Sequence, residues 1–167
     1  MEDQTSQLMG EAIGLLPIGR YLMTAACDGQ RGGMIVTSVQ RCCDEPALIC
    51  VAARKGHKID PLIRDSRSFA VGIIAEDDKL IPRRFKLSDS APVELPVVGD
   101  DDPFDAIPTR TLVTGAPILL RCTTWFDCEV MRRVDLEAEK ELFVGMIVSV
   151  LHNGEQLNIN RVPEELD

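Results

Sequence analysis

Short apolar runs bounded by turn residues recur along this sequence, and that pattern limits the fold more than any other feature. The turn dipeptide Asp28-Gly29 joins a run at 20–27 to another at 34–39, which is typical of a β-hairpin. Further runs that predict strands lie at 47–53, 69–74, 116–122, 124–132, 141–151 and 156–160. Helical spacing or capping residues predict short helices at 5–15, 60–66 and 79–85. The chain is therefore expected to be mainly β, an antiparallel barrel with a few short helices across its openings.

The length favours one domain, because 167 residues can bury a single substantial core. We find no internal repeat and predict a single domain over residues 1–167. One segment, 87–110, stands apart, since four prolines and the acidic run Asp100–Asp102 interrupt any periodicity there. A connection of this length is typical of an arm or a lid.

Charge and composition exclude several classes of protein. A net charge of -9 argues against nucleic-acid binding, and no apolar stretch approaches the roughly 18 residues of a membrane helix. The N-terminus carries acidic residues where a secretory signal needs basic ones, which predicts a cytoplasmic protein. The six cysteines show no CxxC pair, so no metal site is predicted. Cys42-Cys43 is expected to bury one thiol and expose the other, with a redox role as the alternative.

The basic residues are concentrated in one segment. Residues 54–86 hold nine of the 18 basic residues against five acidic ones, a net charge of +4 in an acidic chain. A local field of this sign suits an anionic ligand, whereas the alternative is a solvated helix face.

Several common catalytic motifs are missing. The sequence contains neither of the glycine-rich nucleotide-binding loops, GxGxxG and GxxxxGK[ST], and it contains no GxSxG elbow. Its two histidines are His57 and His152, and the second adjoins the turn Asn153-Gly154. Hydrolysis by a histidine-based triad is therefore not favoured.

Two short stretches carry the groups that a phosphorylated ligand needs. Thr37 and Ser38 end a predicted strand and can donate hydrogen bonds. The run Ala53–Lys58 contains Arg54, Lys55, His57 and Lys58, with Gly56 to admit the ligand close to the backbone. The N-terminus of the helix that Asp60-Pro61 starts adds its dipole. These features predict an anionic ligand with a hydrogen-bonding head group, and ordinary sheet surface is the alternative for Thr37-Ser38.

The order of these segments resembles the flavin reductase-like family of FMN-binding split barrels. The resemblance covers roughly residues 15–152. It rests on Gly33–Ser38, Glu45–Leu48, Arg54–Lys58, Ser66–Val71, Thr114–Pro117, Trp125–Val130 and Leu142–Gly145, in that order and at similar gaps.

The resemblance implies an antiparallel split β-barrel of the Greek-key type, with FMN bound near a homodimer interface. It places Thr37, Ser38 and Val39 along the flavin ring and ribityl chain. It places Arg54, Lys55, His57 and Lys58 at the phosphate end, and Ala53 is expected among the cofactor-binding residues.

The chain departs from the family pattern at two places. His57 and Ile59 stand where many members have Ser or Thr, and Ala138-Glu139-Lys140 stands where reductases often have Gly-Asp-His. Lys140 is thus a weak candidate for a residue near the nicotinamide. The alternative is that it is one charge in an exposed run, Asp135–Glu141.

The resemblance leaves three functions open. The first is NADH- or NADPH-dependent flavin reduction by hydride transfer. The second is a non-enzymatic FMN-binding protein or electron carrier of the same fold, and the third is a dimeric scaffold that binds no flavin. The electron acceptor, such as a partner oxygenase, stays open in each case.

Overall fold

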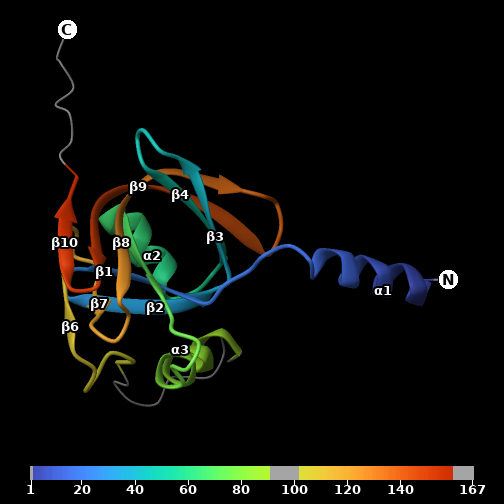
Figure 1. The fold of residues 1–167 in the computed structure, drawn as a ribbon, viewed down its shortest axis with the longest axis horizontal. Coiled ribbons are helices and arrows are strands. Elements are labelled where there is room, and N and C mark those ends of the chain that lie inside the picture. The colour runs from blue at the N-terminus through green and yellow to red at the C-terminus, as the bar shows by residue number, and fades with distance from the viewer. Residues whose placement is uncertain (1, 91–101, 160–167) are drawn as a thin grey trace, which may run out of the picture.

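A computed structural model describes residues 2–90 and 102–159 (Figure 1). The helices are α1 (Glu2–Ile13), α2 (Ile59–Ser66) and α3 (Leu80–Ser90). The strands are β1 (Tyr21–Cys27), β2 (Gln30–Val36), β3 (Ser38–Cys43), β4 (Leu48–Arg54), β5 (Ser68–Ile73), β6 (Thr109–Arg110), β7 (Ile118–Leu119), β8 (Thr124–Asp135), β9 (Lys140–His152) and β10 (Glu155–Asn158).

One curved antiparallel sheet dominates the structure. Its strand order is β2-β1-β5-β8-β9-β4-β3, with β10 paired to β9, while β6 and β7 form a separate pair. The two outer strands, β2 and β3, are consecutive in the chain but are not paired to each other, so the barrel stays open along that line. The expected mainly β, antiparallel split-barrel fold is thereby confirmed.

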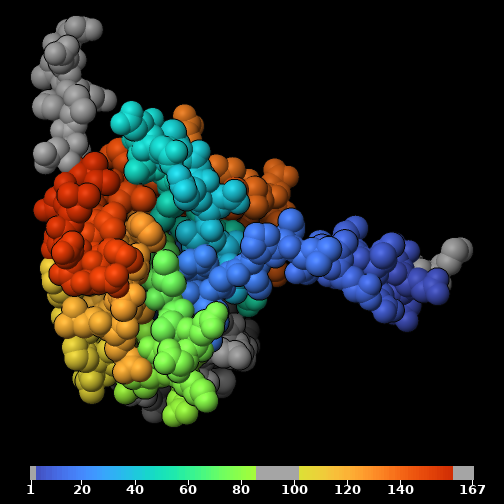
Figure 2. Space-filling view, in the orientation of Figure 1, coloured from blue at the N-terminus to red at the C-terminus, as the bar shows by residue number. Residues whose placement is uncertain are grey.

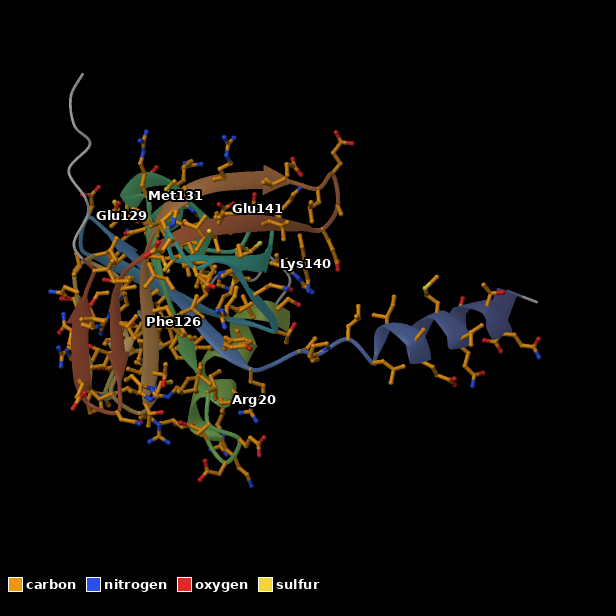
Figure 3. All side chains as sticks on the ribbon, turned by 45° about the horizontal axis from the view of Figure 1, so that its top comes forward. Arg20, Phe126, Glu129, Met131, Lys140 and Glu141 are labelled. Atoms are coloured by element: carbon orange, nitrogen blue, oxygen red, sulfur yellow. The ribbon has the colours of Figure 1, made fainter. Side chains whose placement is uncertain are left out.

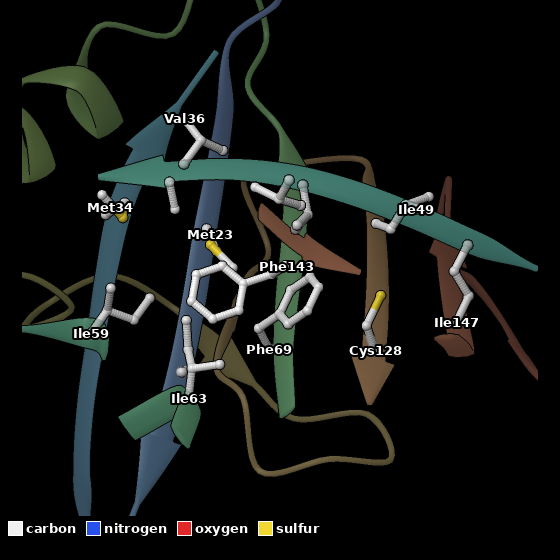
Figure 4. Packing of buried hydrophobic residues seen from close by; sticks show 14 residues of the cluster. Met23, Met34, Val36, Ile49, Ile59, Ile63, Phe69, Cys128, Phe143 and Ile147 are labelled. Atoms are coloured by element: carbon white, nitrogen blue, oxygen red, sulfur yellow. The ribbon is translucent and has the colours of Figure 1, made fainter. Parts of the chain in front are cut away.

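The barrel interior holds the first of two apolar clusters (Figure 4). Strand residues such as Met23, Phe69 and Phe143 fill it, and Ile59 and Ile63 of α2 pack against it from one end. α2 presents these two residues at i and i+4, the spacing of one helix face. The helix is therefore fixed where the basic run 54–58 leads into it.

The second cluster lies under α3. Phe85 of α3 meets Phe104 edge to face at 5.1 Å, and the indole of Trp125 is fully buried nearby. Asp78 caps α3, since its Oδ1 accepts the backbone N–H of Leu80 at 2.9 Å and of Ile81 at 3.2 Å. Part of the proline-rich segment, from residue 102 on, thus packs on the barrel, while residues 91–101 lie outside the described part. Its role as an arm or a lid stays a prediction.

The prediction of one strand at 34–39 is wrong in one respect, because the structure has two strands there. β2 ends at Val36 and β3 begins at Ser38, with Thr37 at a bend between them. β2 pairs with β1 whereas β3 pairs with β4. The chain must therefore turn where it exchanges one neighbour for another.

The strand expected at 116–122 is reduced to the two residues of β7. The carbonyl of Leu119 accepts the indole N–H of Trp125 at 2.9 Å and the N–H of Cys122 at 3.2 Å. The hydrogen bonds from the Trp125 indole and from the turn at Cys122 thus take the place of the backbone pairing that a longer strand would make.

The expected start of α2 is also corrected. Lys58, not Asp60, is the N-cap residue, and it makes no side-chain capping bond. The carboxylate of Asp60 is instead bound by Arg133, with Nη2 to Oδ2 at 3.0 Å.

The expectation for the cysteine pair is wrong, because Cys42 and Cys43 are both exposed. The pairing of β3 with β4 slips between Arg41 and Cys43, and this irregularity breaks the strict in-and-out alternation on an edge strand. All six cysteines carry free thiols.

Within the described ranges, no helix combines the length and the apolar character that crossing a membrane requires. No cluster of three or more His, Cys, Asp or Glu suited to a metal ion occurs among the same residues.

Candidate functional site

A hollow of about 120 Å³ opens where β2, β4 and β9 meet the bend at residue 37. Its walls combine an apolar floor from two strands with one hydroxyl and two cationic side chains. They are formed by Met34, Ile35, Val36, Thr37, Ala52, Arg54 and Lys140. The hollow therefore offers apolar contact and positive charge side by side.

Arg54 and Lys140 are direct neighbours in the sheet. The antiparallel pairing of β4 with β9 sets them opposite each other, so their side chains leave the same face of the sheet. Two like charges opposite each other destabilise a sheet. An anion bound between them would remove that repulsion, so the local electrostatics favour a negatively charged ligand.

Thr37 reaches the hollow because the chain bends there. Its carbonyl accepts the N–H of Gly19 at 2.9 Å, which ties the bend to the segment before β1. The Thr37 side chain is exposed and forms part of the hollow's wall. Of the residues predicted from sequence, Thr37, Arg54 and Lys140 are thus brought together.

Three other predicted residues lie beside the hollow without lining it. Ser38 and Val39 stand in β3 opposite Ala52 and Val51. The side chain of Ala53 packs in the barrel core with 2% of its surface exposed. Because alternate residues of β4 point to opposite faces, Ala52 and Arg54 face the hollow while Ala53 cannot.

The rest of the basic run diverges from the hollow. Lys55 forms an ion pair with Asp135, and its backbone N–H donates to the Glu139 carbonyl at 3.0 Å. Lys58 is exposed at the start of α2. The five-residue run therefore does not act as one cluster around the hollow.

His57 is half-buried just before α2. Its Nδ1 accepts the backbone N–H of Ile59 at 3.2 Å, so a neutral ring would carry its proton on Nε2. Burial lowers the pKa of His57 below 6.5, and the charges of Lys58 and Arg54 lower it further. At neutral pH the ring is uncharged and can donate one hydrogen bond from Nε2.

An ion pair between Arg133 and the buried Glu141 fixes the strand that carries Lys140; Figure 3 labels Lys140 and Glu141 on this strand. Glu141 is only 3% exposed, so the expected exposed run Asp135–Glu141 is wrong at its end. Arg133 donates to both carboxylate oxygens of Glu141, at 2.6 Å and 2.8 Å, and also reaches Asp60 of α2. Lys140 itself is half-buried beside this pair, as one wall of the hollow.

Four residues of the hollow were absent from the sequence prediction. Met34, Ile35 and Val36 belong to the same motif as Thr37, so the signal was present in the stretch Gly33–Ser38. Ala52 carries no polar atom in its side chain and offers no such signal. Its place follows only from the strand pairing.

The sequence model of the flavin reductase-like domain family matches residues 13–162 of the chain. Among known proteins, diflavin flavoprotein A 2 of Synechocystis sp. is 30% identical over 128 residues, which are 76% of this chain and 21% of that protein. The NADH-dependent flavin reductase StyB of Pseudomonas fluorescens is 27% identical and covers 87% of this chain and 78% of its own length. The FMN reductase (NADH) RutF of Bradyrhizobium diazoefficiens is 22% identical, with coverages of 88% and 77%. The chain thus spans about a fifth of the diflavin flavoprotein but most of the two reductases.

Solved structures share the fold over nearly the whole chain. Nitrilotriacetate monooxygenase component B from Mycobacterium thermoresistibile superposes with a TM-score of 0.71 at 20% identity, covering 100% of this chain and 92% of that one. The flavin reductase PheA2 gives a TM-score of 0.67 at 20% identity, with coverages of 93% and 98%. The match of residues 13–162 to the family model confirms the family expected from the ordered motifs.

Proposed function

Because the chain belongs to the flavin reductase-like family, we propose that it is an FMN-binding oxidoreductase that reduces flavin with hydride from NADH or NADPH. The observation that carries the proposal is the hollow in which Thr37, Arg54 and Lys140 meet over an apolar floor. StyB and RutF, which this chain resembles over most of their length, bear the names of NADH-dependent reductases.

The residues of the hollow fit FMN in their chemistry. An isoalloxazine ring needs apolar contact and hydrogen-bond partners at its edge, and a phosphate needs cationic donors. Ile35 and Ala52 supply the first, Thr37 the second, and Arg54 and Lys140 the third. With about 120 Å³ the hollow is smaller than the roughly 300–1,000 Å³ of a complete small-molecule site. One part of the ligand would sit in it, and the rest would need a further wall.

FMN, when bound, supplies the hydride-accepting chemistry itself. The residues of this chain hold and orient the ligand. Arg54 and Lys140 neutralise its negative charge, and the Thr37 hydroxyl hydrogen-bonds a polar edge. The apolar floor excludes water from one side. Holding two rings in contact accounts for a large share of the rate in such a transfer, so no general base is required.

The same proposal includes assembly and location. A homodimer would supply the missing wall of the open hollow, and two-fold dimers are the commonest assembly of soluble proteins. A cytoplasmic location is supported by six free thiols, which persist in reducing compartments.

Anaerobic mixing tests the activity. We expect the purified protein to take up FMN. The visible absorbance of the bound flavin should then bleach on addition of NADH or NADPH. A protein that binds FMN but is bleached by neither nucleotide would be a carrier and would contradict the reductase assignment. Failure to bind FMN at all would contradict the flavin site.

A further inference from the structure

The N-terminal extension, residues 2–18, stands away from the barrel (Figures 1 and 2). Every residue from 3 to 18 is exposed, and large apolar side chains are among the most exposed of the chain. Leu15 is 85% exposed, Ile18 72%, Leu8 69% and Leu16 65%. Within α1, Leu8, Met9, Ala12 and Ile13 recur at i, i+1, i+4 and i+5, which places them on one face.

A helix of this kind is not stable alone. α1 has 12 residues, and isolated helices shorter than about 12–15 residues are marginal in water. Its apolar face has no neighbour among the described residues of its own chain. The physical expectation is that another surface covers this face.

The site at which the extension leaves the barrel indicates that surface. Gly19 is bonded to Thr37, so the extension departs from the wall of the hollow itself. Figures 1 and 3 show the extension and the β8–β9 hairpin projecting from the same side of the barrel, with Lys140 near the turn of the hairpin. The hairpin exposes Met131, Val134 and Leu136 at 51%, 39% and 48%.

Charge complementarity supports the same region. Residues 2–18 carry three acidic and no basic residues, while the hollow beside which the extension departs carries the cationic Arg54 and Lys140. An acidic, apolar extension therefore matches a surface that combines the cationic hollow with the apolar hairpin. Every copy of this chain has both the extension and the surface that would receive it.

We propose that the extension docks on a second copy of this chain, beside that copy's hollow, and that the two copies exchange extensions reciprocally. The inference rests on the homodimer of the proposed function and adds the contact that holds it. Each copy gives one extension and receives another, which brings the interface toward the roughly 20–30 residues a side of a stable complex. Because each extension leaves the barrel at Gly19, beside Thr37, the exchange brings a second copy over both hollows.

The test compares two double variants of the full chain. Leu15→Glu/Leu16→Glu places charge on the extension, and Leu120→Glu/Leu157→Glu places the same charge on exposed leucines of the barrel body, 52% and 66% exposed. Light scattering at micromolar concentration should give twice 18.4 kDa for wild type and the body variant, and 18.4 kDa for the extension variant. Circular dichroism checks that both variants keep the β fold.

Hydrogen exchange of the α1 amides gives an independent readout. Docked amides should be protected in wild type and lose that protection on dilution to the monomer, because an isolated helix exchanges rapidly. A monomeric wild type, a dimeric extension variant, or unprotected α1 amides in a wild-type dimer would each overturn the proposal. FMN reduction by wild type is measured alongside, so that a failed exchange with intact reduction leaves the proposed activity standing.

Discussion

Arg54 and Lys140 carry the charge of the hollow, and each can be tested alone. Arg54→Gln removes the guanidinium and its charge while keeping a polar side chain. A hydrogen bond to a charged group contributes about 1.5–3 kcal/mol, so FMN should bind at least about tenfold more weakly. Riboflavin, which lacks the phosphate, should lose little. Fluorescence titration with both ligands checks this, with Arg64→Gln on the exposed face of α2 as the control. Equal losses for FMN and riboflavin would contradict the phosphate assignment.

Lys140 is expected to assist binding more than the transfer of hydride. It lines the hollow opposite Arg54, but the transfer itself depends chiefly on the positions of the two rings. Lys140→Ala should therefore change the rate of flavin reduction by less than about tenfold, which is roughly 1.4 kcal/mol in the barrier. Stopped-flow bleaching under anaerobic conditions measures it. A hundredfold fall with saturating FMN would instead make Lys140 part of the catalytic machinery.

His57 should make stability depend on pH. Its pKa is lowered by burial and by Lys58 and Arg54, so the unfolded chain takes up the proton first as the pH falls. Its contribution to stability is complete above pH 6.5 and is lost as the pH drops through the folded-state pKa. Urea unfolding between pH 8 and pH 5 should show a shallower decline for His57→Gln than for wild type. Parallel curves would show that His57 contributes nothing to the slope.

At the scale of elements, the β8–β9 hairpin is joined to α2 by Arg133. Arg133→Leu would leave Glu141, which is 3% exposed, without its partner. Breaking a buried pair costs about 3–5 kcal/mol, and since Arg133 is itself 36% exposed we expect about 3 kcal/mol, the lower end of that range. Guanidinium chloride unfolding measures this loss.

The neighbour Arg132 gives a matched control for that variant. Arg132 is exposed on the same strand, so Arg132→Leu should change the unfolding free energy by less than about 0.5 kcal/mol. The double variant Arg133→Leu/Glu141→Leu should recover part of the loss, because the buried carboxylate of Glu141 is then removed together with its partner. Equal losses of unfolding free energy in Arg133→Leu and Arg132→Leu would refute the stabilising role given to the pair of Arg133 and Glu141.

Two motifs that suggested the family have structural roles in this chain. Asp127 is fully buried and accepts the backbone N–H groups of Val113 at 2.9 Å and Thr114 at 2.7 Å. Burial raises the pKa of Asp127, and the hydrogen bonds from Thr114 act against that rise. At Gly145 a Cβ atom would lie 2.5 Å from Cζ of Phe69, so the strand can pass the ring only with glycine there. These residues hold the barrel together and do not line the hollow.

At the scale of the whole molecule, ligand binding should stabilise the fold. A ligand that binds only the folded state adds about 2.7 kcal/mol when present at about 100 times its Kd. FMN at that concentration should therefore raise the melting temperature, and riboflavin at the same concentration should raise it less. Differential scanning calorimetry measures both shifts. Identical shifts would show that the phosphate makes no net contact with the chain.

Hydrophobic alternation and turn residues were enough to predict most elements of this chain. Asp28 and Gly29 have φ values of 50° and 77°, the left-handed conformation that their turn requires. The long strands β8 and β9 contain the runs predicted at 124–132 and 141–151, and β4 begins one residue later than the run predicted at 47–53. These features depend on neighbours a few residues apart, so the local sequence contains the information.

The site depended on contacts that the local sequence does not specify. Thr37 and Arg54 belong to motifs and were predicted, but their meeting with Lys140 follows from the register of β4 against β9. Register is settled by which faces of all the strands are buried together. The joint burial of these strand faces also accounts for the bend at Thr37, for the burial of Glu141 against Arg133, and for the place of Ala53 in the core. The sequence by itself thus determined the family and the split-barrel fold, while only the tertiary structure decided which of the predicted residues share one hollow.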